Sequence, residues 1–177
     1  MKANPQPRIV PALAAAALLL LASSCAEQRV IPAPAPSPSP TPPPPPAPRP
    51  VENWQDARLT PGDWTWGMEA GRSIARFAAG QLVLACDRAQ RVVTLSRPAT
   101  APGPVIVTVQ TSNLLRALTA TPREGANPTV AVDIAASDPL LDAMAFSRGR
   151  FVVETAGLPT LVVPSWTEVS RVVEDCR

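Results

Sequence analysis

Three cysteines carry the most reactive side chains in this chain of 177 residues: Cys25, Cys86 and Cys176. A thiol can be acylated, oxidised to a disulfide or bound to a metal. The chain has no histidine and no tyrosine, and its one lysine is Lys2. These absences exclude a Ser-His-Asp triad, a Cys-His nucleophile, histidine-ligated zinc and a Schiff-base lysine in the folded part. We therefore assign no catalytic residue, no cofactor and no metal ion to this sequence.

The first 24 residues have the composition of an export signal. Lys2 and Arg8 give a positive start, and residues 9–22 are apolar apart from a break at Pro11. This length is typical of a signal-peptide hydrophobic region. It falls short of the roughly 20 apolar residues that span a bilayer. We therefore expect residues 1–24 to be removed on export.

Cys25 follows the run Leu-Leu-Ala-Ser-Ser at residues 20–24. This stretch resembles the lipobox of bacterial lipoproteins, although Ala22 occupies the position where that family favours leucine. The resemblance implies diacylation of the Cys25 thiol and cleavage before it. With Ala26 next, it implies the outer membrane, facing the periplasm. The alternatives are the outer face of the inner membrane, or secretion after ordinary signal cleavage, which would leave Cys25 a thiol.

A proline-rich segment follows the predicted acylation site, and we assign residues 25–50 to an anchored linker. In residues 32–50, 12 of 19 residues are proline. Proline fixes φ and removes amide donors, so this composition favours polyproline II at about 3.1 Å per residue. The linker would be a semi-rigid spacer of roughly 60 Å between membrane and domain. A ligand for proline-recognising modules is the alternative.

Residues 51–177 are long enough for one domain with a hydrophobic core. The net charge of +2 for the whole chain does not describe this part, where 12 arginines stand against 13 acidic residues. A net charge of −1 leaves no basic excess for the nucleic acid backbone. We therefore expect no nucleic acid partner. The membrane would be reached through the lipid anchor.

Cys86 and Cys176 are predicted to form a disulfide. An exported domain folds in an oxidising compartment, where two remaining cysteines are expected to pair. Cys86 shares one face of a predicted strand with Leu82 and Leu84, and Cys176 shares one face of a predicted helix with Val173. Both sulfurs should then point to the core. Two separate buried thiols are the alternative.

Period-two alternation and β-branched residues predict seven or eight short strands. Their connections have hairpin lengths, and strands do not alternate regularly with helices. We therefore expect a mainly β (α+β) fold with two short helices, built as an antiparallel sandwich or a partly open barrel. The predicted strands are residues 64–66, 72–78, 81–87, 91–97, 105–111, 129–135, 150–155 and 158–163, while residues 114–120 fit a strand or a helical turn.

Two helices are predicted near the C-terminus. Asp138 and Pro139 have the types preferred at an N-cap and at the first helical position. Ser165 and Glu168 have the spacing of a capping box, in which hydroxyl and carboxylate satisfy reciprocal amides. The second helix should dock through a face that runs from Trp166 to Cys176, and the disulfide should hold it on the sheet.

Three residue pairs could bind a ligand. Trp64 and Trp66 share a strand face and could stack on a sugar, although large aromatics are more often core. Arg148 and Arg150 flank a glycine and could hold an anion, although exposed arginines more often serve solubility. The third pair, Asp138 and Asp142, is one helical turn apart, but helix capping and solvation explain it without a ligand.

Residues 138–154 and 161–177 together resemble the C-terminal part of small envelope proteins from high-GC Gram-negative bacteria. That group has no assigned activity, so the resemblance brings no catalytic residue. We expect a non-enzymatic lipoprotein that presents its β domain to an envelope protein or supports envelope structure. The alternatives are a carbohydrate- or peptidoglycan-binding module that uses Trp64 and Trp66, and a hydrolase with converging carboxylates.

Overall fold

The computed structural model describes residues 53–177. The predicted signal peptide, Cys25 and the proline-rich segment lie outside the described residues. Neither described helix is long and apolar enough to cross a bilayer. The elements in chain order are β1 (Trp64–Glu69), β2 (Arg72–Phe77), η1 (Ala78–Gly80), β3 (Leu82–Asp87), β4 (Val92–Pro98), β5 (Val105–Gln110), β6 (Leu115–Arg123), β7 (Thr129–Ala135), α1 (Pro139–Ala145), β8 (Arg150–Thr155), β9 (Leu161–Pro164) and α2 (Thr167–Asp175).

The described strands form one sheet of nine, in the order β1-β2-β3-β4-β7-β6-β5-β8-β9. Every pairing is antiparallel. The expected mainly β fold with two helices is confirmed. Residues 114–120, which the sequence left ambiguous, belong largely to β6, the longest strand of the sheet.

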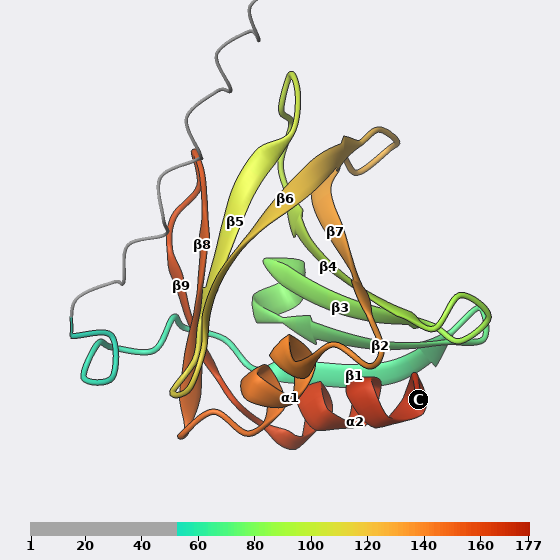
Figure 1. Ribbon diagram of the computed structural model, residues 1–177. Coiled ribbons are helices and arrows are strands. Elements are labelled where there is room, and N and C mark those ends of the chain that lie inside the picture. Colours follow the sequence, from blue (N-terminus) through green and yellow to red (C-terminus); the bar gives the residue numbers. More distant parts are fainter. Residues whose placement is uncertain (1–52) are drawn as a thin grey trace, which may run out of the picture. The chain divides into compact units, whose positions relative to one another are not determined.

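The sheet curls on itself because β6 pairs with different neighbours along its length (Figure 1). Residues 115–120 pair with β5, whereas residues 121–123 pair with β7. The curl brings the first and last strands together, and the Trp64 indole Nε1 donates to the Pro164 carbonyl at 2.9 Å. A side-chain bond rather than a strand ladder thus joins β1 to β9. The fold is the partly open barrel of the two expected architectures.

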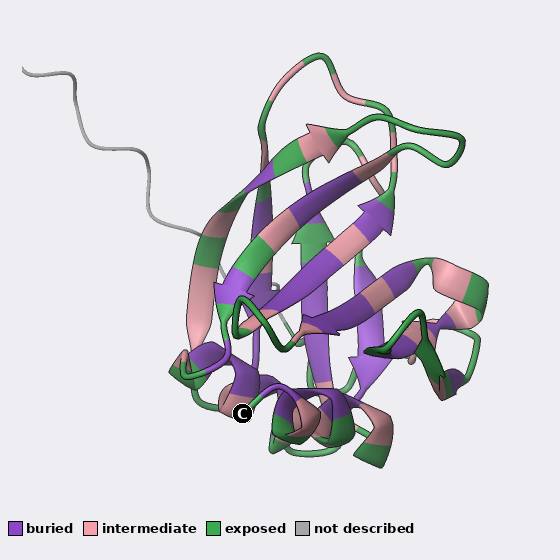
Figure 2. Cartoon of the chain, turned by 90° about the vertical axis from the view of Figure 1, so that its right-hand side faces the viewer, coloured by how far each residue is buried: buried purple, intermediate pink, exposed green. Residues whose placement is uncertain are grey.

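The core lies inside the curl, where alternate residues of each strand meet. On β3 these are Leu82, Leu84 and Cys86, and each is fully buried. Their register neighbours on β4 include Val93 and Leu95, as the alternation predicts. Buried residues interrupted by intermediate or exposed ones run along the strands, and both helices contain buried residues (Figure 2).

The two helices cover one end of the curled sheet (Figure 1). The start of α1 agrees with the sequence, since the Asp138 carboxylate accepts from the Leu140 amide and Pro139 is the first helical residue. The helix buries Leu140, Leu141 and Met144. These apolar residues hold α1 against the barrel core.

The expected capping box of α2 is wrong. The N-cap is Trp166, which makes no side-chain cap bond. The Ser165 hydroxyl instead donates to the Met144 carbonyl at the end of α1, so it joins the two helices. Trp166 is 44 % exposed, and the docked face of α2 consists of Val169, Val172 and Val173 with Cys176. The Ser165 hydroxyl therefore bonds to α1 instead of capping α2.

Residues 53–62 form a strap on the outer face of β8 and β9. Trp54 is buried against Val152 and Val162 in a small apolar cluster separate from the main core. The Thr60 amide donates to the Val162 carbonyl at 2.9 Å, and the Thr60 hydroxyl accepts from the Val162 amide at 2.9 Å. The strap thus occupies the backbone amide and carbonyl of Val162 in the middle of β9.

Gly62 ends the strap at a position that requires glycine. Its φ is +133°, and a Cβ there would lie 2.5 Å from the Ala78 Cβ. The close approach lets the chain turn into β1, where the Ala78 amide donates to the Asp63 carbonyl at 3.0 Å.

Candidate functional site

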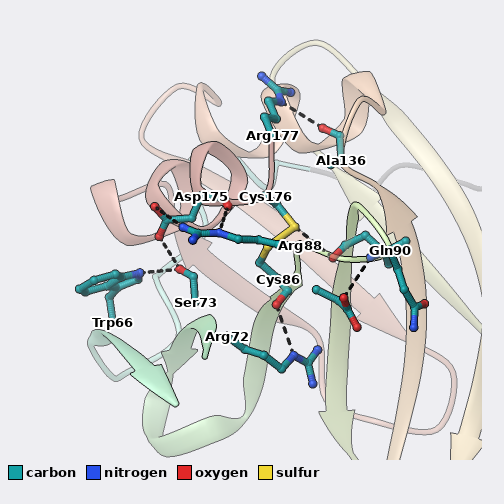
Figure 3. Close-up of a disulfide and its surroundings, with 12 residues drawn as sticks. Trp66, Arg72, Ser73, Cys86, Arg88, Gln90, Ala136, Asp175, Cys176 and Arg177 are labelled. Atoms are coloured by element: carbon teal, nitrogen blue, oxygen red, sulfur yellow. Dashed lines mark hydrogen bonds and ion pairs between the residues drawn. A yellow bond between two sulfur atoms is a disulfide. The ribbon is translucent and has the colours of Figure 1, made fainter. Parts of the chain in front are cut away.

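The Cys86–Cys176 disulfide predicted from the sequence is confirmed. The two Cα atoms are 5.4 Å apart, and both residues are buried. The bridge fixes the end of α2 to β3 (Figure 3). A disulfide that solvent does not reach has a structural role, because thiol exchange requires access to the sulfur.

Trp64 is a core residue. It is 5 % exposed, and its ring centroid lies 5.4 Å from that of Phe77. Its indole donor is occupied by the Pro164 carbonyl. The expectation that Trp64 and Trp66 together offer a stacking platform is therefore corrected, because only Trp66 reaches the surface.

Trp66 is held by a chain of hydrogen bonds that ends on α2. Its Nε1 donates to the Ser73 hydroxyl at 2.8 Å, and this hydroxyl donates to Asp175 Oδ2 at 2.6 Å. Asp175 is also within 3.7 Å of the Arg88 guanidinium. Figure 3 shows this chain beside the disulfide. The hydrogen bonds through Ser73 to Asp175 thus fix the orientation of the Trp66 ring, and the adjacent disulfide holds Asp175 in place.

Trp66 lines a groove between β1 and the first turns of α2. The other lining residues are Thr167, Glu168 and Arg171, and the groove has a volume of about 300 Å³. The Arg171 guanidinium lies over the Trp66 ring, 3.9 Å from its centroid, in a cation–π contact. The groove therefore presents an aromatic ring, a hydroxyl and one charge of each sign.

Arg148 and Arg150 do not converge on an anion. Arg148 is exposed. Arg150 instead donates through NH1 to the Ala57 carbonyl of the strap. The turn at Gly149 explains the separation, because its φ of 75° redirects the backbone between the two arginines just before β8 begins. Arg150 serves the packing of the strap.

The aspartates of α1 are also engaged within the fold. Asp138 accepts from Arg116 at 2.6 Å in addition to capping the helix. Asp142 accepts from Arg177 at 2.8 Å. Each carboxylate faces its own arginine, so the pair does not form the converging acids that a hydrolase requires.

Asp133 has a displaced pKa. The hydrogen bond from the Thr94 hydroxyl at 2.6 Å is the largest cause that lowers the pKa of this carboxyl below its ordinary value of 3.8. Burial opposes it, and the Arg123 and Arg72 guanidinium groups lower the pKa further. The group lies on the outer face of the sheet, and its side chain is 51 % exposed. It is a surface ion pair between β7 and β6.

The lowered pKa predicts a small loss of stability in acid. Because Asp133 titrates lower in the folded than in the unfolded chain, its contribution is complete above pH 3.8 and is lost as the pH falls through the folded pKa. Solvent screening limits this contribution to less than about 1 kcal/mol. Thr94→Val should raise the Asp133 titration midpoint measured by carboxyl-carbon NMR. An unchanged midpoint would show that the arginines Arg123 and Arg72, rather than Thr94, depress the pKa.

Arg97 is a buried cation on the core side of β4. It shares that side with Val93 and Leu95 and is 4 % exposed. Its Nε donates to the Gln81 carbonyl over a long 3.4 Å, and its NH1 is buried without a partner in the described part of the chain. Burial lowers the pKa of Arg97, since it penalises the charged form.

Comparisons with known proteins find no matching family model, no similar curated protein and no similar solved structure. Sequence reasoning missed Ser73, Asp175 and Arg171. Ser73 lies on β2, the strand paired with β1. Arg171 reaches Trp66, and Asp175 reaches Ser73, only when α2 docks. No local pattern in the sequence marks them.

Proposed function

We propose that the protein is a non-enzymatic lipoprotein of the bacterial envelope. A disulfide-locked β domain stands off the membrane on a proline-rich tether and interacts with an envelope protein or supports envelope structure. The observation that carries the proposal is the order of three features along the chain: Cys25 after an apolar leader, the proline-rich run at residues 32–50, and the folded domain.

One observation supports export to an oxidising compartment, and another favours a non-enzymatic role. The Cys86–Cys176 bridge is of the kind that persists outside the reducing cytosol. The two aspartates of α1, Asp138 and Asp142, each pair with an arginine rather than converging as a pair of acids. This arrangement favours a binding or structural role over hydrolysis.

Replacement of the acylation site tests the anchor. A Cys25→Ser chain lacks the thiol that carries lipid, and acyl chains contribute about 0.8 kcal/mol per buried CH₂ to membrane binding. We expect this variant to leave the membrane fraction of bacterial cells completely, whereas a Cys86→Ala/Cys176→Ala control remains there. A Cys25→Ser chain that still sediments with membranes at high salt would refute the lipid anchor.

A cell-wall-binding module is the second candidate, and the groove at Trp66 favours it. The groove is near the lower end of the size range of small-ligand sites. In this second proposal, the groove would be the surface that contacts peptidoglycan. Trp64 has no part in this reading because it is buried.

A further inference from the structure

Arg171 is positioned by an aromatic ring rather than by an acid. Its guanidinium carbon lies over the Trp66 ring, 3.9 Å from the ring centroid. A cation–π contact leaves the guanidinium N–H donors available for hydrogen bonds, because the ring supplies no conventional acceptor. Within residues 53–177 no carboxylate lies within ion-pair distance of Arg171, whereas Arg116 and Arg123 each bind an aspartate. Arg171 is thus an ordered cation with unused donors beside a groove.

Glu168 brings the opposite charge to the same groove. It lies three residues before Arg171 on α2, yet the two side chains form no ion pair. The Glu168 carboxylate accepts a long hydrogen bond of 3.5 Å from the Thr167 hydroxyl. Separate opposite charges on one wall complement a ligand that carries both an acidic and a basic group.

The Trp66 wall is preorganised for a ligand. The ring is fixed by the chain through Ser73 to Asp175, and Asp175 precedes the disulfide-bonded Cys176. A rigid wall avoids the ordering cost that a mobile side chain adds to binding. Because Arg171 already covers a face of the ring, the groove is less suited to sugar stacking than a bare tryptophan.

We propose that this groove binds a short zwitterionic peptide. Its free carboxylate would accept from the Arg171 guanidinium, its ammonium group would donate to the Glu168 carboxylate, and its apolar part would contact Trp66. A volume of about 300 Å³ limits the ligand to a few small residues. The inference rests on the second candidate function, binding to the bacterial cell wall. It names a peptide rather than a sugar as the component of peptidoglycan that the groove recognises.

Titration of the full chain with four probes tests the assignment. The probes are alanylalanine, its C-terminal amide, its N-acetyl form and N-acetylglucosamine. The readout is the indole N–H signal of Trp66 by NMR, identified from a Trp66→Phe spectrum. We expect alanylalanine to shift the signal in a saturable way, and each blocked form to bind about tenfold more weakly because a charge-assisted hydrogen bond is lost.

Two variants and a matched control separate the contributions. Arg171→Gln should abolish the preference for the free carboxylate, and Glu168→Gln the preference for the free amine. Arg148→Gln, which removes an exposed arginine elsewhere, should change neither. Equal binding of free and blocked peptides would overturn the proposal. A response to the sugar alone would overturn it while retaining cell-wall binding, and no response to any probe would remove both, with the Cys25→Ser result unaffected.

Discussion

Removal of the Cys86–Cys176 bridge is expected to lower the free energy of unfolding by about 4 kcal/mol. The two cysteines are separated by 90 residues, so the bond restrains most of the unfolded domain. The same bond holds the end of α2 over the barrel. In the Cys86→Ala/Cys176→Ala chain, the midpoint of thermal unfolding should fall by about 15 °C in circular dichroism.

The loss should have a local signature as well as a global one. With the bridge absent, the end of α2 depends on the Ser73–Asp175 bond and on the packing of Val169 and Val173. Amide hydrogen exchange should therefore accelerate in the last turn of α2 before the strands open. A control with reduced wild-type protein should match the double variant. An unchanged midpoint on reduction would contradict a stabilising role for the bond.

Replacement of Arg97 by methionine is expected to stabilise the domain by about 2 kcal/mol, since a buried cation without a counter-charge costs more than an apolar side chain of similar length. Arg97 is 4 % exposed among apolar neighbours, and its NH1 has no partner in residues 53–177. The midpoint of thermal unfolding of the Arg97→Met variant, measured by circular dichroism, should rise by about 8 °C.

Two further variants test whether the change in stability is specific to the buried charge of Arg97. Arg148→Met removes an exposed arginine and should change the stability by less than about 0.5 kcal/mol. Arg97→Leu should stabilise the domain in the same direction as Arg97→Met. A clear loss of stability in both Arg97 variants would mean that the guanidinium is satisfied by an acceptor and that its burial is favourable.

Strand alternation was the most reliable information in the sequence. The strands at residues 129–135 and 150–155 have the predicted bounds, and the inward faces of β3 and β4 follow the period of two. The disulfide followed from the same logic, because two independent periodicities directed both sulfurs inward. These features depend on local burial, which the order of apolar residues encodes directly.

Tertiary contacts account for what the sequence did not provide. Ser165 has the spacing of a cap, but the end of α1 offers it a carbonyl that only the folded chain brings near. Trp66 and Arg171 meet because α2 crosses the end of the sheet. The charge of Arg97 shares the inner period with Val93 and Leu95, so alternation alone places it in the core. Because arginine is rarely buried in protein cores, residue type alone would place Arg97 at the surface.

The strap formed by residues 53–62 affects how copies of this protein can associate when they lie close together. An unpaired outer strand is a template on which a second copy can add its own strand, and crowded β proteins aggregate by this route. Here Thr60 already occupies the amide and the carbonyl of Val162, and Trp54 covers the neighbouring apolar surface. Dense arrays of this protein are thereby protected at β9 from joining edge to edge into continuous ribbons.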